Sequence, residues 1–205
     1  MTIRHSAARR STALAGVALA ALLGLSACGG STPASGGGSA PSGEIASDAA
    51  YNEQDVTFAK DMKPHHEQAV EMAEMALAKS PTPRIKALAD KIKAAQDPEI
   101  AQLDALLAEF DVETDGSGGH SISKGSSMSM GMMADDDMQA LEDASGQQAE
   151  MLFLEGMLEH HNGAVEMATR EIDDGKYPEA VELAAKIKAA QQTEITEMEQ
   201  LLGQA

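Results

Sequence analysis

The stretch "MKPHHEQAVEMA" (residues 62–73) places two adjacent histidines in a run whose apolar residues have helical spacing, and "MLEHHNGAVEMA" (157–168) repeats it. The two copies are offset by 95 residues. The same offset matches "LADKIKAAQDPEI" (88–100) to "LAAKIKAAQQTEI" (183–195). Agreement over two separated stretches indicates an internal duplication, and each copy is long enough for two helices.

Four long helices are predicted from the periodicity, which makes the fold class all-α with a four-helix bundle. Repeat 1 spans about 52–110 and repeat 2 about 147–202, within a domain of residues 49–204. Asn52 caps the first helix, Thr82 offers its hydroxyl to a helix that starts on Pro83, and Gly175 suits a helix end. The linker (111–134) is mostly loop, and a short helix follows over about 135–144.

The N-terminus has the features of a bacterial lipoprotein signal. Residues 1–27 hold a basic start and the apolar run "STALAGVALAALLGL" (11–25), and "LSAC" ends the segment at Cys28. We expect cleavage before Cys28 and lipid on that residue, with an ordinary secretory signal as the alternative. The Gly, Ser and Pro of residues 28–48 predict a flexible tether. The folded domain is therefore expected on the outer face of the cell membrane, held by the lipid anchor alone.

Charge and cysteine content restrict the chemistry. The chain has 33 acidic and 15 basic residues, a formal net charge of −18, so nucleic acid is an unsuitable partner because phosphate binding needs clustered Lys and Arg. Cys28 is the only cysteine, which leaves His, Met, Asp and Glu as candidate metal ligands. The acidity by itself is also what keeps an exported helical protein soluble.

The histidine pairs lie on the apolar faces of their helices. At about 100° per residue, His66 falls inside the stripe formed by the apolar neighbours, and His65 lies on its shoulder; His161 and His160 repeat this placement. A single core histidine is most often a hydrogen-bonded structural residue. Four at duplicated positions need many polar partners in an apolar core, and a metal ion would satisfy several at once.

The neighbouring residues indicate which metal. Met62 and Met157 stand three residues before the pairs, where ferritin-like di-iron bundles carry Glu. Thioether and imidazole form a soft ligand set that favours copper, especially Cu(I). Asp55 and Glu150, ten residues before each pair, are candidates for an oxygen ligand or for an acceptor that orients a ligand. They lie ~15 Å along the axis from the histidines, so they cannot share a coordination sphere with them within one straight helix.

The linker carries a second signal in "HSISKGSSMSMGMMADDDM" (120–138). Methionine in a helix usually fills the core, and we expect this role for Met75 and Met198. The linker segment is otherwise too polar to need core-filling methionines. A copper-capture segment is the first hypothesis, and surface hydrophobes or a partner-binding patch are the alternatives. The residues concerned are His120, Met128, Met130, Met132, Met133 and Met138.

The doubled pattern M-x-x-H-H-x-x-A-x-x-M-A, with Asp55, Phe58 and Phe153 before it and "MGMMADDDMQAL" (130–141) leading into the second copy, resembles the domain-of-unknown-function 305 family over residues 50–204. The resemblance implies a ferritin-like bundle of exported bacterial proteins, some of which bind copper. One departure is Glu150, where the family usually has Asp. The ligands that the family implies here are His65, His66, His160, His161, Met62 and Met157, with Met72 and Met167 as further candidates.

Three functions are compatible with these observations. The first is a membrane-tethered copper-binding protein that sequesters or delivers the metal without catalysis. The second is a structural or interaction protein of the cell envelope whose histidines only form hydrogen bonds. The third is a dinuclear metal oxidase, which needs carboxylates that face the site. A homodimer suits this architecture, although no exposed stripe identifies an interface.

Overall fold

The computed structural model describes residues 45, 48–80, 82–112 and 130–203. Contacts divide the chain into two units, Met1–Ser42 and Gly43–Ala205, and the first lies outside the described residues. The predicted signal peptide, Cys28 and nearly all of the tether fall there. None of the described helices is both long and apolar enough to span a bilayer.

The described part of the second unit is all-α, which confirms the predicted fold class. It contains α1 (Glu53–Lys79), α2 (Pro83–Glu109), α3 (Asp135–Asp143), α4 (Gln147–Asp174) and α5 (Pro178–Leu202). These bounds agree with the prediction to about one residue, because Asn, Gly and Pro mark the helix ends clearly.

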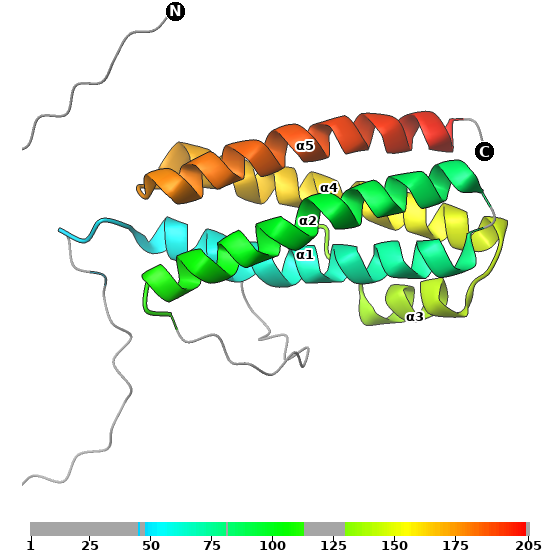
Figure 1. Cartoon of the computed structure of the whole chain (residues 1–205), viewed down its shortest axis with the longest axis horizontal. Helices are drawn as coiled ribbons and strands as arrows, with labels where there is room; N and C mark the ends of the chain where they lie inside the picture. Colours follow the sequence, from blue (N-terminus) through cyan, green and yellow to red (C-terminus); the bar gives the residue numbers. More distant parts are fainter. Residues whose placement is uncertain (1–44, 46–47, 81, 113–129, 204–205) are drawn as a thin grey trace, which may run out of the picture. The chain divides into compact units, whose positions relative to one another are not determined.

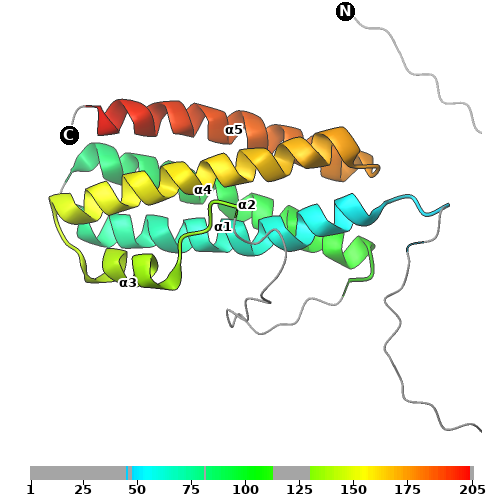
Figure 2. The same cartoon turned by 180° about the vertical axis from the view of Figure 1, so that it is seen from behind.

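The four long helices form a bundle of two hairpins, α1 with α2 and α4 with α5 (Figure 1). The hairpins meet chiefly through α1 and α4, and the short α3 packs against both (Figure 2). α1 and α4 are antiparallel, since the Asn52 side chain at the start of α1 donates to the Asp174 carbonyl at the end of α4. Equivalent residues of the two copies therefore meet near the middle of the bundle.

The ends of the helices are stabilised by side-chain caps. Asn52 accepts hydrogen bonds from the backbone of Gln54 and Asp55, and Asp55 accepts one from the backbone of Asn52, which completes a capping box. The expected cap of α2 by the Thr82 hydroxyl is wrong. Ser80 Oγ instead accepts the Thr82 N–H, because the extended backbone at Ser80 brings its hydroxyl to that donor.

Asp55 and Glu150, the two carboxylates expected near a metal, connect the hairpins instead. Asp55 Oδ1 accepts the backbone N–H groups of Lys176 and Tyr177, both at 2.9 Å. Glu150 Oε1 accepts the Thr82 N–H at 2.9 Å. Each residue lies at the start of its hairpin's first helix and caps the loop of the other hairpin, so neither is placed to bind a metal at the histidines.

The core is divided into two hydrophobic clusters. One contains Phe58 and Met62 with Leu103 and Met167; the other contains their repeat counterparts, Phe153 and Met157 with Met198 and Met72. Between the two clusters, each long helix contributes two polar residues with little solvent exposure. We call this set the polar layer: His65, His66, Gln96, Glu99, His160, His161, Gln191 and Glu194.

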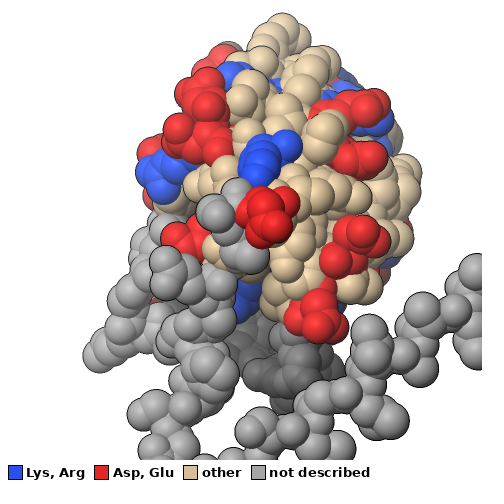
Figure 3. All heavy atoms as spheres, turned by 90° about the vertical axis from the view of Figure 1, so that its left-hand side faces the viewer, with Lys and Arg blue, Asp and Glu red and all other residues tan. Residues whose placement is uncertain are grey.

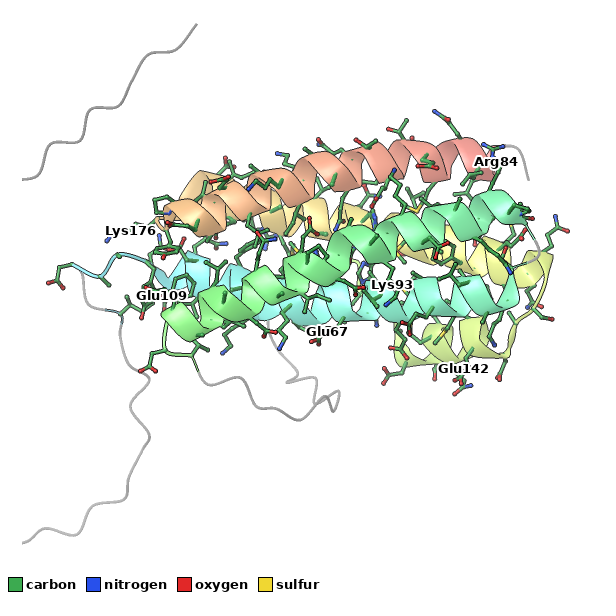
Figure 4. All side chains as sticks on the ribbon, viewed as in Figure 1. Glu67, Arg84, Lys93, Glu109, Glu142 and Lys176 are labelled. Atoms are coloured by element: carbon green, nitrogen blue, oxygen red, sulfur yellow. The ribbon has the colours of Figure 1, made fainter. Side chains whose placement is uncertain are left out.

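Charged side chains cover the outside of the bundle. Glu67 on α1 and Glu142 on α3 point away from it (Figure 4). At the end where α1 begins, acidic and basic side chains are interspersed with uncharged ones (Figure 3). The described part of that face therefore carries charges of both signs.

Candidate metal centre

The four paired histidines meet at the centre of the bundle. The two from α1 and the two from α4 are each at most 2% exposed. The rings of His65 and His160 are stacked closest, with centroids 3.7 Å apart and planes tilted by 41°. The duplicated sequence and the antiparallel packing of α1 and α4 together bring these equivalent side chains face to face.

Three of the rings have an oxygen acceptor at Nε2. His66 Nε2 lies 2.9 Å from Glu99 Oε2, and His161 Nε2 lies 2.8 Å from Glu194 Oε2. Glu99 and Glu194 are repeat counterparts on α2 and α5, so the same pair is formed twice. The third acceptor is the backbone carbonyl of Met130, 3.0 Å from His65 Nε2.

Many polar atoms of this layer nevertheless have no partner among the described residues. They are Nδ1 of His65, His66 and His161, both ring nitrogens of His160, and both side-chain amide atoms of Gln96 and Gln191. An unpaired buried polar atom is costly, and native proteins contain few of them. The polar layer therefore has free nitrogen and oxygen atoms that could bind an ion or a polar ligand.

Burial keeps the stacked histidines neutral. Desolvation, reinforced by the neighbouring imidazole of His66, lowers the pKa of His65 from 6.5 to about 3. The pKa of His160 is also lowered well below 6.5, chiefly by burial and then by His65. A neutral imidazole carries a nitrogen lone pair, which is the form that binds metals.

The candidate methionines of the helices lie on both sides of the polar layer. Met62 and Met167 belong to one hydrophobic cluster, and Met72 and Met157 to the other. All four are at most 7% exposed. Each side of the layer thus has one thioether from α1 and one from α4, an arrangement that the 95-residue repeat produces directly.

The end of the Met-rich linker lies against the site. We call residues 130–133 the strap, which runs along α1 and α4 before α3 (Figure 2). Met130 packs on one hydrophobic cluster and Met133 on the other, so the strap crosses the polar layer. Gln68 holds it by donating to the Met133 carbonyl and accepting the Met133 N–H, at 2.9 and 2.8 Å. Met132 is half-buried, while His120 and Met128 lie outside the described residues.

Glycines on α4 make room for the strap. A Cβ at Gly163 would overlap the Met130 carbonyl, and one at Gly156 would overlap the Met133 methyl group and lie 3.3 Å from the Met72 methyl. Gly131 has φ of +77° and packs its backbone against Gly163. Gly156 and Gly163 are seven residues apart and therefore lie on the same face of α4.

Four residues of the polar layer were not predicted from the sequence: Glu99, Glu194, Gln96 and Gln191. A signal was present: at about 100° per residue, Glu99 falls some 20° from Ile92, inside the apolar stripe of α2. All four residues also lie in the stretches that match between the copies. The apolar stripe predicts that these residues are buried, but it does not predict which residue on a neighbouring helix they contact.

The donor set suits a soft metal. Within the described ranges, no three His, Cys, Asp or Glu side chains converge closely enough to hold a metal ion. A site made from those residue types alone, such as a tetrahedral zinc site, therefore does not fit the arrangement. Two imidazoles completed by thioether sulfur fit copper, which accepts low coordination numbers in its Cu(I) state. Assignment of the individual ligands stays a prediction.

Comparison with known proteins identifies the family. The profile described as "Domain of unknown function (DUF305)" matches residues 55–202. The chain belongs to the DUF305 family. The resemblance inferred from the doubled histidine motif is thus confirmed, while no curated protein matches the chain.

Solved DUF305 structures share the fold. A DUF305 fragment from Deinococcus radiodurans is 32% identical, with a TM-score of 0.68, over 77% of this chain and 100% of that one. A DUF305 protein from Streptomyces coelicolor is 29% identical, with a TM-score of 0.64, over 74% and 91%. CopM in its Cu(I)-bound form is 30% identical, with a TM-score of 0.60, over 73% and 96%. CopM was also solved in Cu(II)-bound and silver-bound forms.

Proposed function

We propose that this DUF305 protein binds copper outside the cytoplasm, for sequestration or delivery, and catalyses no reaction. The observation that carries the proposal is the set of four buried histidines, whose ring nitrogens are left partly unpartnered between two pairs of methionines. The copper-bound and silver-bound forms of CopM support it, since both metals in their monovalent states prefer soft ligands.

Imidazole and thioether would hold the metal. The histidines of the polar layer are the primary ligands in this proposal, with Met62, Met157, Met72 and Met167 available on either side. The strap adds Met130, Met132 and Met133 above the site, and His120 and Met128 complete the capture segment. This soft set favours Cu(I) over Cu(II).

The location is part of the proposal. The signal in residues 1–27 and the lipobox cysteine support attachment of Cys28 to a lipid on the outer face of the cell membrane. The Gly/Ser/Pro-rich tether would give the bundle reach from that surface. Mass spectrometry of the mature protein tests this: it should begin at Cys28, with lipid on the thiol and on the new N-terminus.

His160→Leu is the sharpest test of copper binding. Among the described residues, neither ring nitrogen of His160 has a partner at hydrogen-bond geometry, so this change breaks no well-formed hydrogen bond and should leave the melting temperature of the metal-free protein unchanged or raise it. It removes a ligand, so copper affinity should fall at least tenfold. Competition titration with a Cu(I) chelator measures this, with zinc and iron titrated in parallel under reducing and oxidising conditions.

A second variant controls for redundancy among the rings. Changing all four paired histidines to Ala should abolish tight copper binding, with helical content followed by circular dichroism. Unchanged stoichiometry and affinity in the variant that keeps its helices would sink the proposal.

The structural or interaction role is the second candidate, and one observation favours it. Three of the four Nε2 atoms already have protein acceptors without any metal. That reading predicts no change in melting temperature with any metal, whereas copper at 100 times its Kd should stabilise the protein by ~2.7 kcal/mol.

An oxidase would need carboxylates at the site. Glu99 and Glu194 do face the histidines, but each pairs with a separate imidazole. The proposed binding protein should therefore consume no oxygen with Cu(I) or Fe(II). Sustained turnover of the loaded protein in an oxygen electrode would favour the oxidase instead.

A further inference from the structure

We infer that Glu99 and Glu194 are positioning residues that fix the tautomers of His66 and His161, so that Nδ1 of each ring is the atom presented to a metal. The backbone carbonyl of Met130 does the same for His65. The part of this inference that concerns metal binding rests on the proposed function. The part that concerns the tautomers rests on the hydrogen bonds of the metal-free structure.

Hydrogen-bond roles determine where the ring protons lie. A backbone carbonyl can only accept, so His65 Nε2, 3.0 Å from the Met130 carbonyl, carries the proton. An ionised carboxylate also only accepts, which places the protons of His66 and His161 on Nε2 toward Glu99 and Glu194. In each neutral ring the lone pair is then on Nδ1.

The three Nδ1 atoms are the ones without partners. Each is buried, and no hydrogen-bond partner among the described residues reaches it. If these rings served only to link helices, the opposite nitrogen would be expected to find a donor as well. In each of these rings, the nitrogen without a hydrogen-bond partner, Nδ1, is thus the one suited to coordinate a metal.

The histidine–glutamate pair occurs twice, and the residues that flank the two pairs differ. His66 with Glu99 joins α1 to α2, and His161 with Glu194 joins α4 to α5, with the same 33-residue spacing. Around them the copies differ: Pro98 precedes Glu99 where Thr193 precedes Glu194. The pair has the geometry of the carboxylate–histidine–metal triads in which a carboxylate orients the ligand and increases its basicity.

His160 is the exception in the set. Among the described residues, neither of its nitrogens has a partner at hydrogen-bond geometry, and the backbone of His65 acts on the ring without forming a well-aligned hydrogen bond. Its ring stacks on His65 and can present either nitrogen. The four rings thus each offer a nitrogen, but no three of them converge on one point among the described residues, so in this arrangement one ion would contact two imidazoles at most.

The first test needs no metal. Long-range ¹H–¹⁵N correlation spectra of the metal-free full-length protein at pH 7 report the tautomer of each histidine. His65, His66 and His161 should be Nε2–H tautomers. Nδ1–H tautomers at His66 and His161 would overturn the inference. This readout holds whether or not copper binds, so failure of the proposed function and failure of the inference are distinguishable.

The second test measures the effect on the metal. Glu99→Gln with Glu194→Gln keeps the size of each side chain and an oxygen acceptor but removes the charge. The Nε2–H tautomers should persist while Cu(I) affinity falls 10- to 100-fold. Affinity within twofold of the wild type would overturn the positioning role.

Two further variants complete the design. Glu182→Gln is the matched control, because Glu182 is exposed and pairs only with Lys186; it should leave Cu(I) affinity unchanged. Glu99→Ala with Glu194→Ala removes the acceptors altogether and should mix the tautomers of His66 and His161 while leaving His65 as Nε2–H. Retention of pure Nε2–H rings at both positions would contradict the assigned cause.

Discussion

Glu171 is a buried carboxyl with no obvious counter-charge. It lies on α4, is 0% exposed, and its Oε1 has no hydrogen-bond partner among the described residues. Burial, followed by the hydrogen bond and charge of neighbouring Asp55, raises the pKa of Glu171 from 4.5 to about 8. The first copy of the repeat has Ala76 at this position, so the feature belongs to one hairpin only.

This raised pKa predicts a pH dependence of stability. The folded chain holds a proton on Glu171 that the unfolded chain releases near pH 4.5, so its contribution is fully present below that pH. It is lost as the pH rises through about 8. Between pH 5 and pH 9 the free energy of unfolding of the wild type should fall relative to that of Glu171→Gln, in urea titrations.

The exposed Glu182→Gln serves as the control, since it should follow the wild type between these pH values. Parallel pH profiles for the wild type and Glu171→Gln would contradict the prediction.

At the residue scale, the sequence predicted which side chains are buried better than it predicted their hydrogen-bond partners. The position of His66 in the apolar stripe follows from helical periodicity, and the structure buries it. Its partner Glu99 lies on another helix, and the pairing depends on how α1 and α2 rotate against each other. The role of Asp55 was mistaken for the same reason, because its acceptor atoms face a loop 121 residues away in sequence.

At the scale of elements, α4 is specialised for close contact with the strap. Gly156 and Gly163 stand where the first copy has Asp61 and Gln68. The two glycines open space on α4, and Gln68 holds the strap from α1. Sequence alone predicted a Met-rich loop here, but contacts between two backbones leave no periodic pattern to read.

Gly163→Ala should release the strap. The added methyl would overlap the Met130 carbonyl, so the strap must shift or α4 must move, at a cost of about 1–3 kcal/mol in the free energy of unfolding. The hydrogen bond between His65 and Met130 should weaken with it. Urea denaturation measures the first effect, and the ¹⁵N shifts of His65 measure the second.

Gly203→Ala provides a matched control at the end of α5. Its added methyl meets the nearest atom at an ordinary 3.4 Å, and it should be close to neutral. Equal stability of the two variants would show that the strap does not depend on Gly163.

At the scale of the whole bundle, the polar layer interrupts what would otherwise be one continuous core. Gln96 and Gln191 lie in it as repeat counterparts, at most 2% exposed, and neither amide atom of either side chain has a partner among the described residues. Their presence lowers the stability of the metal-free protein, since unpaired buried amides are costly. This is the kind of trade between stability and function found at binding sites.

Replacing both glutamines should therefore stabilise the chain. Gln96→Leu with Gln191→Leu removes the unpaired atoms while nearly keeping side-chain volume, and should raise the free energy of unfolding by about 1–3 kcal/mol per site. Thermal and urea unfolding of the metal-free protein measure it. The exposed Gln192→Leu should have little effect; a loss of stability in the double variant would mean that the amides are hydrogen-bonded in solution.

The reciprocal caps of Asp55 and Glu150 give the interface between the two hairpins an approximate two-fold symmetry. Each hairpin supplies a carboxylate that caps the loop of the other hairpin. Such reciprocal contacts are found at the interfaces of symmetric dimers. The two halves of the chain are thus related as the subunits of a symmetric dimer would be. The symmetry is broken at the strap: an exact two-fold dimer would have two identical strap sites, whereas this chain has the close-contact glycines on α4 only.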